Sequence, residues 1–170
     1  MPIENLNALS PIIVMAAAAI IVTLVVAIKR NHLLTLILTI GGIAVSFYSL
    51  LNLNISSPVH VGILFVVDSY ANFFMGLILI VSAVVAAMIY PYLDKRRENK
   101  EEIYLLIILS SLGGMALAAS DHFVSLVLGL ETLTISLYVL IGYLRDDKLC
   151  IEAAMKYLIL AAASTAFLLL

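Results

Sequence analysis

The chain has 170 residues, of which 64 % are hydrophobic and only 12 % charged, and its formal net charge is −2. Soluble domains are about 45–50 % apolar and about 25 % charged, so this chain has too little polar surface for a water-soluble fold. Disordered chains are apolar-poor and are excluded by the same values. A nucleic-acid-binding role is excluded because it requires an excess of basic residues. The composition predicts an integral membrane protein surrounded by the lipid bilayer.

Six apolar runs are long enough to cross a membrane, which takes about 17–25 residues in an α-helix. The first run is read as a retained span, because residues 1–8 contain no Lys or Arg and the run is too long for a signal peptide. We therefore expect an all-α membrane protein with a single domain over residues 1–170. The predicted spans are residues 9–28, 33–51, 70–93, 103–119, 123–144 and 151–170.

Eight of the nine basic residues occur in alternate loops, after the first, third and fifth predicted spans. Short loops rich in Lys and Arg stay in the cytoplasm, so this pattern predicts an external N-terminus. The same pattern supports the number of spans, because one span more or fewer would scramble the asymmetry. The eight loop residues are Lys29, Arg30, Lys95, Arg96, Arg97, Lys100, Arg145 and Lys148.

The external segment 52–69 has a pattern of its own, with β-branched and apolar residues between Pro58 and Asp68. Such a run is typical of a short strand, here on the outer surface of the protein. An apolar loop packed on the helix ends explains the same residues equally well.

The fourth and fifth predicted spans carry two further local signals. Ser110, Gly114 and Ala118 recur every four residues, and this spacing of small residues predicts a seam where a neighbouring helix packs closely. Asp121 and His122 lie in the tight external turn before the fifth span. They fit either a proton exit or, as we prefer, a solvated turn in which Asp121 caps the helix.

Three charged residues, Glu131, Glu152 and Lys156, fall inside or at the edge of predicted spans. A charge at the bilayer centre costs about 2.5–3.5 kcal/mol on insertion scales, so such residues usually face a helix bundle or a wet cavity. These residues are therefore the candidate functional site.

Glu131 is the ninth residue of the span that begins at Phe123 and lies thirteen residues before Leu144, near the middle of the membrane. Thr134 and Tyr138 follow on the same helical face and form a polar stripe with it. Apolar surroundings favour a neutral carboxyl group and a nearby cation favours a charged one, so such a group can switch protonation, as a proton relay requires. The alternative is a structural carboxyl group bonded to another helix.

Glu152 and Lys156 are spaced as an i,i+4 pair in the favourable order, with the acid first. Lys156 is five residues into the last predicted span, or about 8 Å along the helix. It is expected to hold or pass charge between the cytoplasm and Glu131. Alternatively, the pair anchors the helix end, with the lysine extending toward the headgroups.

Three sequence segments carry a resemblance to a known family. They are LGLE at 128–131, YVLIGY at 138–143 and IEAAMKY at 151–157. These segments lie within residues 102–170. That stretch, with residues 67–94, resembles helices three to six of the subunit N family of bacterial NADH:quinone oxidoreductase, respiratory complex I. The absence of Trp from this chain separates it from the sister subunits L and M, which usually have one near the membrane glutamate.

The resemblance implies roles for the three charged residues. Glu131 falls on the family's proton-translocating glutamate, Lys156 on the lysine of its E-A-x-x-K-Y segment, and Glu152 on the acidic companion. Ser136 stands where the family commonly has a proline, so a helix kink at this position is not expected.

The family also implies a larger architecture, an antiporter-like fold of about fourteen helices with further central lysines. The last predicted span runs to Leu170 with no anchoring residue after it, so the chain is expected to be the front part of such a protein, truncated at its C-terminus. It would be a multi-pass protein of the bacterial inner membrane, in contact with other membrane-arm subunits.

The expected function is a Glu/Lys proton path coupled to electron transfer from NADH to quinone. Cys150 is the only cysteine, His32, His60 and His122 are scattered, and no Gly-rich dinucleotide-binding motif occurs, so no metal or cofactor is expected in this chain. NADH, flavin, iron–sulfur clusters and quinone would bind to partner subunits. The alternatives are a subunit of a multi-subunit cation/proton antiporter or membrane hydrogenase, and a non-transporting scaffold.

Overall fold

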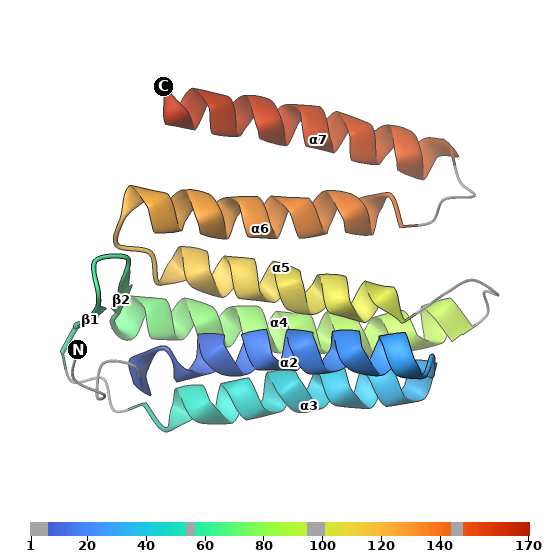
Figure 1. Ribbon diagram of the computed structural model, residues 1–170, viewed down its shortest axis with the longest axis horizontal. Coiled ribbons are helices and arrows are strands. Elements are labelled where there is room, and N and C mark those ends of the chain that lie inside the picture. The colour runs from blue at the N-terminus through green and yellow to red at the C-terminus, as the bar shows by residue number, and fades with distance from the viewer. Residues whose placement is uncertain (1–6, 54–56, 95–100, 144–147) are drawn as a thin grey trace.

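The computed structural model describes residues 7–53, 57–94, 101–143 and 148–170. In this part of the chain, six long helices lie side by side and alternate in direction (Figure 1). Their limits differ from the predicted spans by at most three residues, and residue 144, the predicted end of the fifth span, lies outside the described part. The elements are α2 (Ser10–Ile28), α3 (His32–Leu51), β1 (Val59–Val61), β2 (Phe65–Val67), α4 (Ser69–Asp94), α5 (Glu102–Ala118), α6 (Phe123–Ile141) and α7 (Lys148–Leu169).

Five of these helices are long and apolar enough to cross a membrane, and α5 is shorter at 17 residues. Seventeen residues span about 26 Å, the lower limit for a hydrocarbon core of about 30 Å. The expected all-α membrane fold is confirmed. The external N-terminus stays a prediction, because Lys95, Arg96, Arg97, Lys100 and Arg145 lie outside the described residues. The turn after α2 and the start of α7, which carry Lys29, Arg30 and Lys148, lie at the same end of the bundle (Figure 1).

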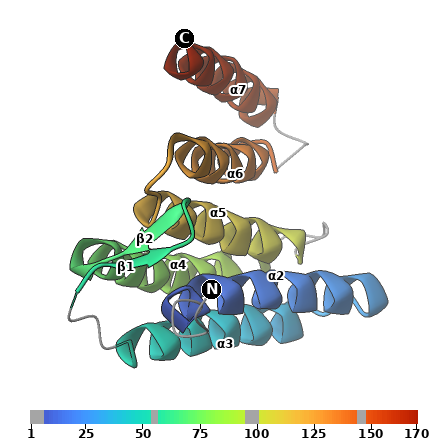
Figure 2. The ribbon, with the colours of Figure 1, turned by 60° about the vertical axis from the view of Figure 1, so that its left-hand side comes forward.

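The helices form successive layers, which Figure 2 shows from the side. Helices α2 to α5 pack into a four-helix core, α6 packs on α5, and α7 packs mainly on α6. The interior of the core is apolar, with Met15, Met75, Leu79, Ile108 and Met115 all completely buried. The outermost helix, α7, therefore has the least support from its neighbours in this part of the chain.

The small-residue seam predicted on α5 at Gly114 is one residue away from the observed close contact, which is at Gly113. A Cβ atom added to Gly114 would meet only the Ile78 side chain, at 3.3 Å. Gly113 instead faces Gly129 of α6, and this pair marks the place where two helix backbones come closest. One residue turns a helix by about 100°, so the four-residue repeat has the right spacing but lies on the wrong face.

Residues 57–67, between α3 and α4, contain two short strands, whereas the sequence predicted one strand or a loop. They pair antiparallel with Val61 opposite Phe65, and Gly62 has φ 67° in the connecting turn. The hairpin is bonded to the α5–α6 turn, since Val66 N donates to Ala119 O at 2.9 Å. The outer ends of α4, α5 and α6 are therefore tied together.

The preferred role of Asp121 as a helix cap is wrong, because the first helical residue is Phe123 and the cap position falls on His122. Val124 N donates to His122 Nδ1 at 3.2 Å, and this bond satisfies a free amide of the first helical turn. Asp121 Oδ2 instead lies 3.1 Å from His60 Nδ1 of the hairpin, in an exposed contact.

Candidate functional site

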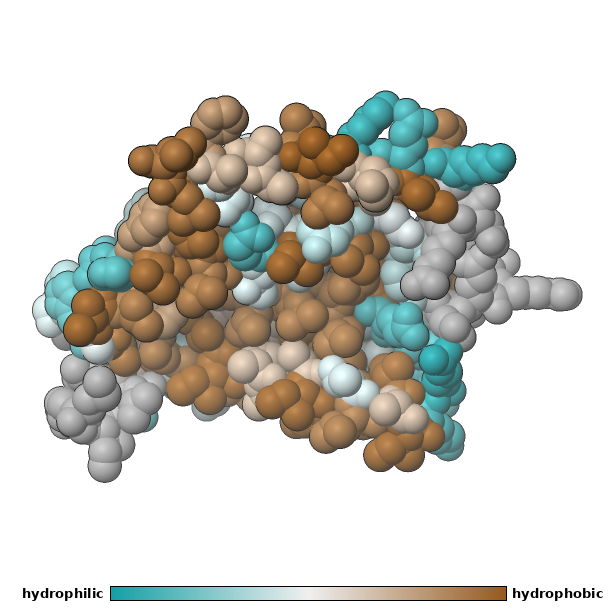
Figure 3. All heavy atoms as spheres, turned by 45° about the horizontal axis from the view of Figure 1, so that its top comes forward, coloured by the Kyte–Doolittle hydropathy of each residue, from teal (hydrophilic) through white to brown (hydrophobic). Residues whose placement is uncertain are grey.

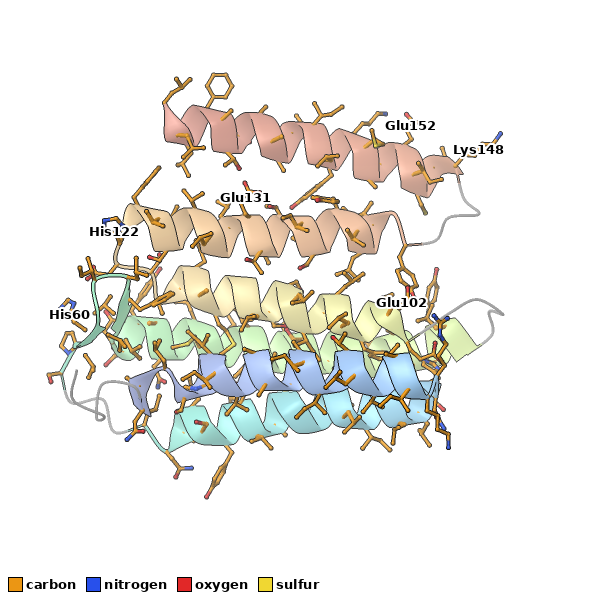
Figure 4. The ribbon with its side chains drawn as sticks, viewed as in Figure 1. His60, Glu102, His122, Glu131, Lys148 and Glu152 are labelled. Carbon is orange, nitrogen blue, oxygen red and sulfur yellow. The ribbon has the colours of Figure 1, made fainter. Side chains whose placement is uncertain are left out.

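Glu131 occupies the middle of α6 and is half-buried. Figure 4 shows its side chain extending from α6 toward α7. Its Oε1 atom accepts a hydrogen bond from Thr165 Oγ1 of α7 at 2.7 Å. The carboxyl group thus bridges the two outer layers of the bundle.

The other polar residues of the expected stripe do not bond to the Glu131 carboxyl group. Thr134 Oγ1 donates within its own helix, to Leu130 O at 2.9 Å and Glu131 O at 3.2 Å. Tyr138 lies two turns from Glu131 on the same face and is half-buried. Since the Thr134 proton is already shared between two carbonyl groups, this hydroxyl is available to the stripe only as an acceptor.

Glu152 and Lys156 form the expected i,i+4 ion pair on α7, with Lys156 Nζ 2.5 Å from Glu152 Oε1. Both side chains are well exposed, at 71 % for Lys156 and 58 % for Glu152. Figure 4 places Glu152 nearer the Lys148 end of α7 than the level of Glu131. The pair is therefore a local contact on one helix.

The structure places Lys156 away from the Glu131 contact. Thr165, the partner of Glu131, is nine residues further along α7, which corresponds to about 13 Å along the helix axis. A hydrogen bond between heavy atoms is about 3 Å long. Any proton path between the ion pair and the carboxyl group therefore needs intermediate hydroxyl groups or water.

The helices that form this contact expose large apolar side chains. Figure 3 shows a largely hydrophobic face with hydrophilic groups gathered at its ends and one hydrophilic patch between them. On α7 the exposed side chains include Ile159, Leu160 and Phe167. An ionisable group among such residues costs free energy, and ionisable residues within a membrane are usually functional.

Ser136 stands in an unbroken helix, as the sequence predicts for a position without the family's proline. Its side chain is 2 % exposed, and its hydroxyl donates to Thr132 O at 2.8 Å. The α6 backbone therefore passes Glu131 and continues to Ile141 without interruption.

Two features of the bundle could not be predicted from the sequence. One is Thr165, whose hydroxyl gives no sign of the helix that it will meet. The other is a groove of ≈ 700 Å³, lined by Ser82, Ser110, Ser111 and Gly114 among others, in which Ser111 Oγ donates to Ser82 Oγ at 2.6 Å. The regular spacing of Ser110 and Gly114 was therefore a signal of this groove rather than of a helix seam.

Comparison with known proteins agrees with this arrangement. The family model described as "NADH:quinone oxidoreductase/Mrp antiporter, TM" matches residues 120–170, the stretch that contains Glu131, Lys156 and Thr165. NADH-quinone oxidoreductase subunit N of Ectopseudomonas mendocina (strain ymp) is 39 % identical over 171 residues, which is 98 % of this chain and 35 % of that protein. The resemblance to the subunit N family is confirmed.

A solved structure agrees with this assignment. A chain of respiratory complex I from Thermus thermophilus, solved with bound aureothin, superposes with a TM-score of 0.80 at 27 % identity. The match covers 94 % of this chain and 34 % of that one. This chain thus spans about a third of the length of each of these two proteins.

Proposed function

We propose that this chain is part of a membrane-arm subunit of a proton-translocating NADH:quinone oxidoreductase. The observation that carries the proposal is Glu131, an acid in the middle of an apolar helix whose carboxyl group reaches a second helix. The likeness to subunit N supports the assignment to this complex. We place the protein in the bacterial inner membrane as a multi-pass subunit, with its N-terminus outside.

In this proposal the redox chemistry takes place in partner subunits. NADH, flavin, the iron–sulfur clusters and quinone bind there, and other membrane-arm subunits pack against this one. This chain contributes proton movement, which is coupled to the electron transfer from NADH to quinone.

The mechanism we propose is electrostatic. A change of charge or conformation passes along the membrane arm and alters the surroundings of Glu131, which then takes up or releases a proton. Lys156 and Glu152 act at a distance, because about 13 Å separates Lys156 from the Glu131 contact along α7. At an effective dielectric constant of about 20, a unit charge at that separation contributes on the order of 1 kcal/mol, and the opposite charge of Glu152, about 6 Å further along the helix, cancels more than half of it. The pair therefore biases the site without contacting it.

The test uses the full-length subunit assembled in its complex. Replacing Glu131 with Gln keeps the size of the side chain and removes its ionisable proton, so proton pumping should fall while assembly on a native gel is unchanged. Ser136→Ala is a matched control on the same helix, because its hydroxyl bonds only to Thr132 O. Unchanged pumping and quinone reduction in a fully assembled Glu131→Gln complex would exclude the relay role.

The rival transport function is a subunit of a multi-subunit cation/proton antiporter, since the matching family model covers those proteins as well. The same Glu131 would then serve sodium/proton exchange. The two functions differ in a direct measurement: an antiporter moves protons in response to a sodium gradient, whereas the complex I subunit moves them when NADH is oxidised. A scaffold without transport predicts that Glu131→Gln and Lys156→Met alter only assembly.

A further inference from the structure

Thr165 has an unusual place on α7. The exposed residues of this helix include large apolar side chains such as Ile159, Leu160 and Phe167, whereas the polar Thr165 is only 9 % exposed. It is the one residue of α7 that is buried in the described part of the chain. The most deeply packed point of the outermost helix is therefore a hydroxyl group, which lies against Glu131.

The hydroxyl also differs from most of the other Ser and Thr side chains of α6 and α7, which donate within their own helix. Thr132, Ser136 and Ser164 each donate to the carbonyl oxygen four residues earlier in their own helix. Thr165 donates across to Glu131 Oε1 at 2.7 Å, within the usual range of a strong O–H···O bond. Its proton is thus committed to the candidate proton-carrying group rather than to the backbone.

We propose that Thr165 is a positioning residue that keeps the Glu131 carboxyl group at the α6–α7 interface in both of its protonation states. A hydroxyl group has one donor and two acceptor sites. It donates to the carboxylate when Glu131 is ionised, and it accepts from the carboxyl O–H when Glu131 is protonated. In the second state the Thr165 hydroxyl donates its own proton to Ala161 O, the carbonyl oxygen four residues earlier. Ser164 donates to Leu160 O in the same way.

This inference rests on the proposed function and adds a geometric requirement to it. Helix α7 packs mainly on α6, and it also carries the Glu152–Lys156 pair. The Thr165 bond sets where the carboxyl group lies relative to α7, and hence its distance from that pair. Without the bond, the Glu131 side chain is free to turn away from α7 between uptake and release of its proton.

The test compares Thr165→Val, Thr165→Ser and Ser164→Ala in the full-length subunit within the assembled complex. Valine has nearly the shape of threonine without the hydroxyl, and serine retains the hydroxyl. Ser164 is the matched control, since it is the adjacent residue and bonds to Leu160 O. The readouts are protons pumped per NADH oxidised and the infrared C=O band of protonated Glu131, assigned by its disappearance in Glu131→Gln.

We expect Thr165→Val to lower the proton yield toward the level of Glu131→Gln and to move the carboxyl band to higher frequency, as the loss of a hydrogen bond requires. Thr165→Ser should restore both the yield and the band position, and Ser164→Ala should leave both unchanged. Proton yields are counted per assembled complex, so a valine variant that assembles poorly does not imitate a loss of pumping.

Other outcomes overturn the inference in distinguishable ways. If Thr165→Val pumps normally with an unshifted band while Glu131→Gln does not pump, Thr165 has no positioning role and the proposed function stands. If Thr165→Ser behaves like Thr165→Val, the hydroxyl is not what matters, and the inference is again wrong. If neither Glu131→Gln nor Thr165→Val changes the proton yield, the proposed function fails together with the inference.

Discussion

Gly113 of α5 and Gly129 of α6 lie where the backbones of the two helices touch. A Cβ atom on Gly113 would lie 2.5 Å from Leu133 N and 3.0 Å from Gly129 O, closer than packed atoms normally come. Gly129 and Glu131 are two residues apart, so they occupy nearly opposite faces of α6. The glycine contact fixes α6 against α5 and thereby directs Glu131 toward α7.

Replacing Gly113 with Ala should therefore destabilise the protein and push α6 away from α5. The obstructing atoms belong to the backbone and have little freedom to move, so we expect a loss of stability of about 1–3 kcal/mol, as for other overpacked cores. The measurement is the midpoint of thermal unfolding of the subunit in detergent. Gly41→Ala is the control, because nothing lies within 4 Å of an added Cβ there. Equal midpoints for the two variants would show that the α5–α6 contact is looser than the structure indicates.

The sequence predicted the helices well and their faces poorly, and both results have a physical reason. The bilayer requires long apolar runs, which any reading of composition detects. It gives no hydrophobic driving force between helices, so an apolar helix does not reveal which side meets a neighbour. For this reason the spacing of small residues indicates the face of Gly114 rather than that of Gly113, and nothing in the sequence predicts the bond between Glu131 and Thr165. The Glu152–Lys156 pair was foreseen because it depends only on spacing within one helix.

Removing the Glu152–Lys156 pair should lower proton pumping and leave stability nearly unchanged. Both side chains are more than half exposed, so the pair contributes about 0.5 kcal/mol or less to folding. We expect Lys156→Met and Glu152→Gln to leave the unfolding midpoint and assembly nearly unchanged while lowering proton pumping per NADH oxidised. Lys148→Gln serves as the control, since it removes an exposed cation from the first turn of the same helix. A large fall in the midpoint without loss of pumping would assign the pair to anchoring instead.

A substitution at Tyr104 should instead lower stability, because the role of this residue is structural. Its hydroxyl lies 2.7 Å from His32 Nε2, and the His32 ring stacks on Tyr90 with centroids 4.6 Å apart. These contacts join α3, α4 and α5 at one end of the bundle. Tyr104→Phe keeps the buried ring and removes the hydrogen bond, so it should cost about 1 kcal/mol of unfolding free energy. Tyr48→Phe, on an exposed tyrosine of α3, should cost nothing measurable. Identical midpoints for both variants would mean that the His32 contact adds no stability.

The hairpin between α3 and α4 should depend on Gly62, which has φ 67°. Any other residue is strained in that conformation by about 1–3 kcal/mol, so Gly62→Val should loosen the turn. The effect should reach the α5–α6 turn, because the amide of Val66 donates to Ala119 O at 2.9 Å. Hydrogen exchange at the Val66 amide is the measurement, and we expect it to accelerate in Gly62→Val. Ile63→Ala alters the next residue of the same turn, which is 81 % exposed, and should leave the exchange rate unchanged. If Val66 stays equally protected in both variants, the link to α5 holds the hairpin without help from its turn.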